Sequence, residues 1–140
     1  EIIQFQLVNW KGTILDRFED ELQRGLGRPI PPEAYPAPEY LGDPRVFVAP
    51  ARTSVREGES LSISATVLGT DAAPRVYLRA MGESGFREVP MRRVAEAVYT
   101  VEVPAQAGDF EYHVAVEAAG EELRWPVTAP ERNHTVIVAP

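Results

Sequence analysis

The chain of 140 residues is long enough for one hydrophobic core and exceeds the roughly 100 residues of a seven-strand β-sandwich, so its front must form something else. Its net charge of −7 argues against nucleic acid and anionic membrane surfaces as partners, and no apolar run is long enough for membrane insertion. The absence of cysteine excludes disulfides, thiolate metal sites and a cysteine nucleophile.

The front of the chain predicts a strand followed by a short helix. Closely spaced apolar residues over 2–8 are typical of a strand. Leu15, Phe18 and Leu22 then recur at the spacing of an amphipathic helix, and Gly25 or Gly27 is expected to end it. Because the chain opens on a strand-like stretch and not on methionine, we expect it to be a segment of a longer protein.

Six prolines follow the helix and predict a stiff strap, since proline favours an extended backbone and cannot donate a hydrogen bond to a sheet. Tyr35 and Tyr40 within the strap, and Trp10 before it, are expected to pack on a neighbouring surface. The chain is therefore expected to divide into a front segment, 1–44, and a β-sandwich domain, 45–140.

Alternating apolar and polar residues in the rest of the chain predict an antiparallel β-sandwich of the immunoglobulin-like or fibronectin type III-like class, so the protein is expected to be mostly β. Leu61, Ile63 and Ala65, for example, point to one face of an extended chain, and the serines between them point to the other. The run that contains Pro90 is expected at the edge of a sheet, because proline has no backbone N–H to donate to a neighbouring strand. The expected strands are 45–50, 60–68, 75–81, 86–94, 98–103, 109–118, 122–127 and 135–138.

Residues 107–112 resemble the entry into the sixth strand of immunoglobulin-like and fibronectin type III domains. A tyrosine there packs inward and turns its hydroxyl back onto the connecting loop, and the resemblance gives this role to Tyr112. Residues 122–130 and 133–138 are similar to the close of the accessory β-domains found C-terminal in bacterial glycoside hydrolases. The resemblance covers roughly 45–138 and implies a non-catalytic module beside a carbohydrate-active domain.

No arrangement of ionisable residues predicts catalysis. The acidic residues of the helix lie on its solvent side, and Glu121 and Glu122 fall in a predicted turn. The two histidines, His113 and His134, lack the spacing of metal ligands, and alternation directs His113 away from Tyr112, toward solvent or a flanking domain. We therefore expect no catalytic residue, no metal site and no cofactor.

Aromatic residues are the candidates for contact with a ligand or with another domain. A sugar ring can stack its C–H face on an aromatic side chain while its hydroxyls bind polar neighbours, although packing is the more common role of such side chains. Alternation with Leu123 and Val127 places Trp125 inside the sandwich. The candidates are Trp10, Tyr35, Tyr40, Tyr77, Arg79, Tyr99 and Trp125.

These observations predict a non-catalytic accessory module whose partner is an adjacent domain of the same polypeptide. An oligosaccharide-binding module and a cell-surface adhesion or envelope domain are the alternatives, and an extracellular or envelope location is favoured. Coplanar exposed aromatics would favour sugar binding. A large apolar patch on the helix or the strap would favour contact with another domain, because monomers rarely expose one.

Overall fold

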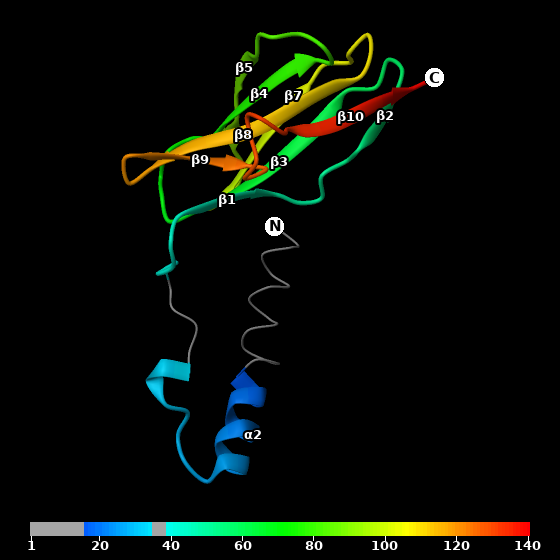
Figure 1. Ribbon diagram of the computed structural model, residues 1–140. Helices are drawn as coiled ribbons and strands as arrows, with labels where there is room; N and C mark the ends of the chain where they lie inside the picture. The colour runs from blue at the N-terminus through cyan, green and yellow to red at the C-terminus, as the bar shows by residue number, and fades with distance from the viewer. Residues whose placement is uncertain (1–15, 35–38) are drawn as a thin grey trace. The chain divides into compact units, whose positions relative to one another are not determined.

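The computed structural model describes residues 16–34 and 39–140 (Figure 1). The chain divides into two compact units, Glu1–Glu39 and Tyr40–Pro140. The strand predicted over 2–8 lies outside the described residues.

The first unit contains α2 (Asp16–Leu26) and a short 3-10 helix, η2 (Pro32–Ala34). α2 confirms the amphipathic helix predicted from Phe18 and Leu22. The helix is followed by Gly27, whose φ of 65° lies in the left-handed region where a side chain is strained.

The second unit is a sandwich of two sheets (Figure 1). Sheet 1 has the order β1–β3–β7–β6, in which all neighbours are antiparallel. Sheet 2 has the order β2–β10–β8–β4–β5, with β9 also paired to β8. Only the pairing of β2 with β10 is parallel among these neighbours. The strands are β1 (Arg45–Val48), β2 (Ser54–Arg56), β3 (Leu61–Leu68), β4 (Arg75–Ala80), β5 (Arg87–Pro90), β6 (Arg92–Arg93), β7 (Val98–Val103), β8 (Phe110–Ala118), β9 (Glu121–Trp125) and β10 (His134–Ala139).

The core lies between the two sheets and is built by the alternation seen in the sequence. Along β3, Leu61, Ile63 and Ala65 are buried while the serines between them are exposed. Phe110 and Tyr112 of β8 are the largest of the fully buried side chains. The mostly β, antiparallel sandwich that the sequence predicts is confirmed, with one parallel pair added.

Tyr112 packs inward as the resemblance implies, with 1% of its surface exposed, and this burial raises the pKa of its hydroxyl. Within the described residues, however, its hydroxyl forms no hydrogen bond to the connecting loop. The inward packing of this tyrosine is confirmed, and the predicted bond to the loop is not observed.

The single strand predicted over 86–94 is wrong, because the chain forms β5 and β6 in different sheets. Pro90 ends β5, and the buried Met91 marks the crossing from sheet 2 to sheet 1. The Met91 N–H donates to the carbonyl oxygen of Pro74, 3.2 Å away, and not to a ladder partner. Both strands lie at sheet edges, as Pro90 predicted.

Two further strands, β2 and β9, also differ from the prediction. β2 has no counterpart among the predicted strands; it is only three residues long and pairs with β10. β9 ends at Trp125, before Pro126, so Val127 is 89% exposed and does not continue the predicted alternation. β9 and β10 share one edge of β8, along Val114–Ala118 and Phe110–Tyr112 respectively.

Candidate functional site

The outer face of sheet 2, which points away from the core, carries a second cluster of packed side chains. His113 lies there and is only 5% exposed, so the expectation that it points to solvent is wrong. Tyr77 stands opposite His113 in the register and stacks on its ring, with centroids 5.1 Å apart and an interplanar angle of 12°. Phe86 packs against the His113 ring in an edge-to-face arrangement, with the two ring centroids 4.9 Å apart. The alternation correctly predicted that His113 points away from the core. It could not predict that neighbouring side chains cover His113 on the outer face.

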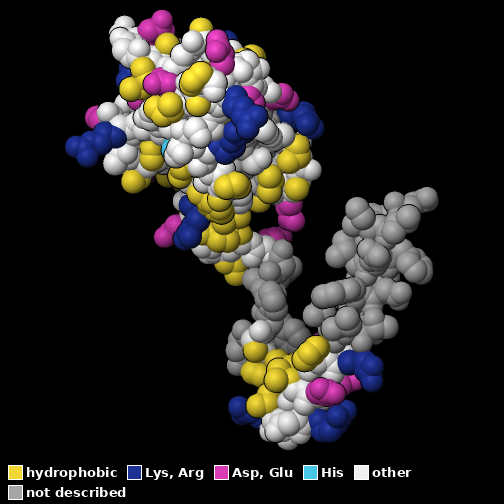
Figure 2. Space-filling view, turned by 90° about the vertical axis from the view of Figure 1, so that its right-hand side faces the viewer, with side chains coloured by type: hydrophobic (Ala, Val, Ile, Leu, Met, Phe, Trp, Pro, Cys, Tyr) yellow, Lys and Arg dark blue, Asp and Glu magenta, His cyan; other side chains and the backbone are white. Residues whose placement is uncertain are grey.

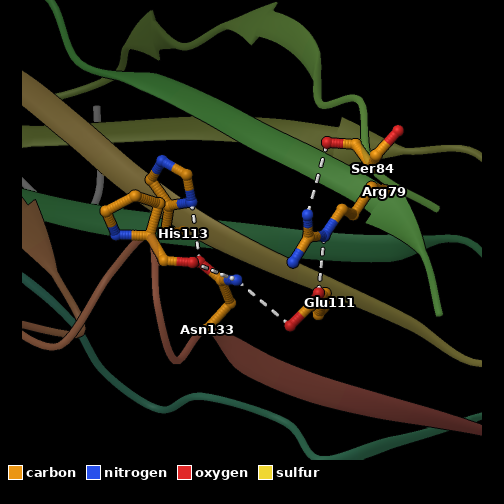
Figure 3. A network of polar contacts seen from close by, with 6 residues as sticks. Arg79, Ser84, Glu111, His113 and Asn133 are labelled. Atoms are coloured by element: carbon orange, nitrogen blue, oxygen red, sulfur yellow. Dashed lines mark hydrogen bonds and ion pairs between the residues drawn. The ribbon is translucent and has the colours of Figure 1, made fainter. Parts of the chain in front are cut away.

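A chain of hydrogen bonds runs across this face (Figure 3). The His113 Nδ1–H donates to Asn133 Oδ1 at 2.9 Å, and the Asn133 amide donates to Glu111 Oε2 at 3.1 Å. Arg79 Nε donates to Glu111 Oε1 at 2.6 Å, and its Nη1 donates to the Ser84 carbonyl oxygen at 3.4 Å. We call Arg79, Glu111, Asn133 and His113 the outer-face network. It joins β4, β8 and the loop that precedes β10.

The charged and ring groups of the outer-face network are largely covered by their neighbours. The side chains of Arg79 and Glu111 are 22% and 15% exposed, so their ion pair is partly shielded from water. The guanidinium of Arg79 also lies 4.3 Å from the centroid of the Phe86 ring, a cation–π contact. Burial lowers the pKa of His113, and the hydrogen bond to Asn133 opposes this shift only in part. The polar groups satisfy one another, which suits a network that holds structure.

Beside the network, the same face is hollowed. A cavity of about 400 Å³ opens where Ala115 of β8 is flanked by larger side chains. Tyr77 and Arg75 line it from β4, Glu117 from β8 and Glu122 from β9. We call this cavity the Tyr77 hollow. It combines an aromatic side chain, a guanidinium and two carboxylates in one concave site.

Of the five candidate contact residues within the described part of the chain, Tyr77 and Arg79 lie together on the outer face of sheet 2. Tyr99 is buried in the core with 4% exposure. Trp125 is partly buried and packs against the core, with its ring centroid 6.1 Å from that of Tyr112, so its predicted inward placement is confirmed.

The other candidates belong to the strap and the front segment. Tyr40 is 40% exposed, and its hydroxyl donates to the Asp43 carbonyl oxygen at 2.9 Å. Trp10 and Tyr35 lie outside the described residues. Ala115 could not be predicted as a site residue, because its role depends on which strands flank β8.

A second candidate surface lies on α2. Phe18, Leu22 and Leu26 follow one another at every fourth position, so they share a face of the helix, and they are 67%, 55% and 51% exposed. We call these three residues the α2 stripe. Figure 2 shows apolar side chains at the surface of this unit beside charged ones. The stripe is the kind of apolar surface that proteins normally cover.

The described residues contain no group of three or more His, Asp or Glu side chains that could hold a metal ion. No helix in residues 16–34 or 39–140 is long and apolar enough to span a bilayer.

Comparison with known proteins bears on the fold alone. No protein-family model and no curated protein sequence matches the chain. An engineered protein solved as a crystal structure is similar over 70% of this chain, with a TM-score of 0.52 and 16% identity, and this chain spans only 20% of its length. A chain from a study of T cell specificity and activation by the bacterial superantigen toxic shock syndrome toxin-1 is similar over 69% of this chain and 99% of its own, with a TM-score of 0.50 and 14% identity.

The twitchin kinase region from C. elegans also matches, over 69% of this chain and 16% of its own, with 19% identity and a TM-score of 0.38. The architecture and the first two likenesses show that residues 40–140 form a β-sandwich, and its assignment to the immunoglobulin-like or fibronectin type III-like class stays a prediction. The association with glycoside hydrolases stays a prediction.

Proposed function

We propose that the chain is a non-catalytic accessory module, in which a β-sandwich is joined to a helical segment that packs against an adjacent domain of the same polypeptide. The observation that carries this proposal is the exposed α2 stripe. Burying a Phe or Leu side chain stabilises a structure by about 1.5–3 kcal/mol. Covering the three residues of the α2 stripe with a partner surface would therefore stabilise the contact between the two.

The length of α2 supports the same conclusion. An isolated helix of 11 residues is marginal in water, and such helices gain most of their stability from packing of an apolar face. Asp20 and Arg24 lie on the face opposite the α2 stripe, so the helix has one side for water and one for a partner.

The charge of α2 favours a protein surface as the partner. Acidic residues such as Asp20 and Glu21 outnumber basic ones in the helix, and an anionic membrane would repel them. A domain in the same polypeptide is favoured over a separate protein, because a covalent link raises the effective concentration of a small apolar surface.

The test compares two double variants in the natural polypeptide that carries this sequence. F18S/L22S removes the apolar face of α2, and D20S/E21S is the matched control, which removes two exposed charged side chains outside the α2 stripe and keeps Arg24. We expect F18S/L22S to speed trypsin cleavage after Arg24 by about ten-fold, because loss of packing exposes the segment to local unfolding, and we expect the control to cleave like the wild type.

Equal cleavage in both variants would contradict the proposal. An equally large effect of F18S/L22S in the isolated 140-residue chain would also contradict it, since the stripe would then pack within this chain and not on an adjacent domain.

A further inference from the structure

We infer that the Tyr77 hollow binds one ring of a neutral saccharide. This inference goes beyond the accessory role and does not rest on it, because every residue that lines the hollow belongs to the sandwich unit.

The hollow follows from the residue sizes on the outer face of sheet 2. Ala115 stands between Arg75 of β4 and Arg124 of β9 in the register, and its methyl group leaves space that the longer neighbours surround. The resulting volume of about 400 Å³ falls within the range of about 300–1,000 Å³ that small-molecule sites occupy. Glu117 and Glu122, which are paired in the register, close the side formed by the β8–β9 hairpin.

The aromatic wall of the hollow is held in place. Tyr77 stacks on His113, and His113 is fixed in turn by its hydrogen bond to Asn133. A side chain that is already immobile loses little conformational freedom when a ligand binds. The outer-face network therefore preorganises an apolar surface that suits the C–H face of a sugar ring.

The polar groups around the hollow are suited to hydroxyl groups. The carboxylates of Glu117 and Glu122 accept hydrogen bonds, and the guanidinium of Arg75 donates them. Hydrogen bonds to such charged groups are about twice as strong as those between neutral groups, so two or three of them can orient a small ligand.

The balance of charge favours a neutral ligand over an ion. Arg75 pairs with Glu88 at 3.1 Å and Arg124 pairs with Glu122, while Glu117 contributes a further carboxylate. Two guanidiniums and three carboxylates give this region a net charge of −1. The carboxylates of Glu117 and Glu122, which line the hollow, would repel an anion. The guanidinium of Arg75 would repel a cation. One face of the Tyr77 ring is also covered by His113, so that face is not available for a cation–π contact.

The test is a titration of the 140-residue chain, followed by amide chemical shifts, with methyl glycosides of glucose, galactose, mannose and xylose. We expect at least one sugar to shift the amide signals of Tyr77, Ala115 and Glu117, with a dissociation constant of about 1–10 mM. Methylammonium and inorganic phosphate serve as probes for the two ionic alternatives.

Two variants connect the binding to the hollow. Ala115→Leu fills the space and Glu117→Ala removes an acceptor from an exposed position, so each is expected to weaken binding by about ten-fold or more. Glu83→Ala is the matched control, because this glutamate lies in the exposed turn after β4 and does not line the hollow. If Ala115→Leu disturbs the fold, as its thermal midpoint would reveal, Glu117→Ala still decides the question.

The inference is overturned if no sugar moves these signals, if methylammonium or phosphate moves them more strongly than any sugar, or if Glu117→Ala binds like Glu83→Ala. None of these results bears on the α2 stripe.

Discussion

His113 is expected to make the stability of the sandwich depend on pH near neutrality. Its burial on the outer face, together with Arg79 and Arg124 nearby, lowers its pKa in the folded state, against the opposing effects of Asn133 and Glu122. The unfolded chain then binds more protons between this lowered pKa and the unfolded value of about 6.5, so stability is complete above about pH 6.5 and falls as the pH is lowered further.

Urea unfolding between about pH 8 and pH 5 measures this dependence. The variant His113→Gln lacks the titrating ring and should show a flatter profile over the same range. Parallel profiles for the variant and the wild type would show that His113 does not contribute. Glu59 contributes little here, because its effect on stability lies between its unfolded pKa of about 4.3 and its folded pKa of about 2, below this window.

The residues of the candidate site differ in how well they could be predicted from the sequence. Tyr77 and Arg79 were identifiable as an aromatic residue and a donor on one strand. Glu111 and Asn133, which hold them in place, are 22 positions apart and meet only through the pairing of β8 with β10. Such partners depend on register between strands, which residue type does not encode.

The turn from β2 into β3 is closed by one carboxylate. Glu59 Oε1 accepts a hydrogen bond from Arg52 Nη1 at 2.7 Å, and Oε2 accepts the backbone N–H of Arg56 at 2.8 Å. Gly58 supplies the positive φ of 78° that the turn needs. The bond from Arg52 and then that from Arg56 lower the pKa of Glu59 to about 2.

A carboxyl titration by NMR should therefore find Glu59 among the most acidic side chains of the protein. In Arg52→Ala the pKa of Glu59 should rise toward its ordinary value of about 4.3 and stay somewhat below it, since the Arg56 bond persists. Lys11→Ala, which removes a positive charge elsewhere in the sequence, is the control. A Glu59 pKa that is ordinary in the wild type would contradict this account of the turn.

The sandwich unit is expected to fold without the front segment. Among residues 16–34 and 39–140, every buried residue of the hydrophobic core lies between Val48 and Val136, inside Tyr40–Pro140. A fragment of residues 40–140 should keep the thermal midpoint of the full chain within a few degrees, as measured by circular dichroism. Phe110→Ala in the same fragment should lower the unfolding free energy by about 3–5 kcal/mol, because Phe110 is 1% exposed.

An unfolded fragment would show that residues before Tyr40 complete the core. A small effect of Phe110→Ala would show instead that the packing around β8 is looser than its burial indicates.

Local alternation was sufficient to predict the two-layer β architecture, the central strands β3, β7 and β8 and the helix α2, because the side of a strand or helix on which apolar groups gather is a property of neighbouring residues. The change of sheet at Met91, the parallel pairing of β2 and the burial of His113 depended on the folded chain, since each is set by residues far away in sequence. The Tyr77 hollow belongs to this second group. It exists because three strands from different parts of the chain place large side chains around one alanine.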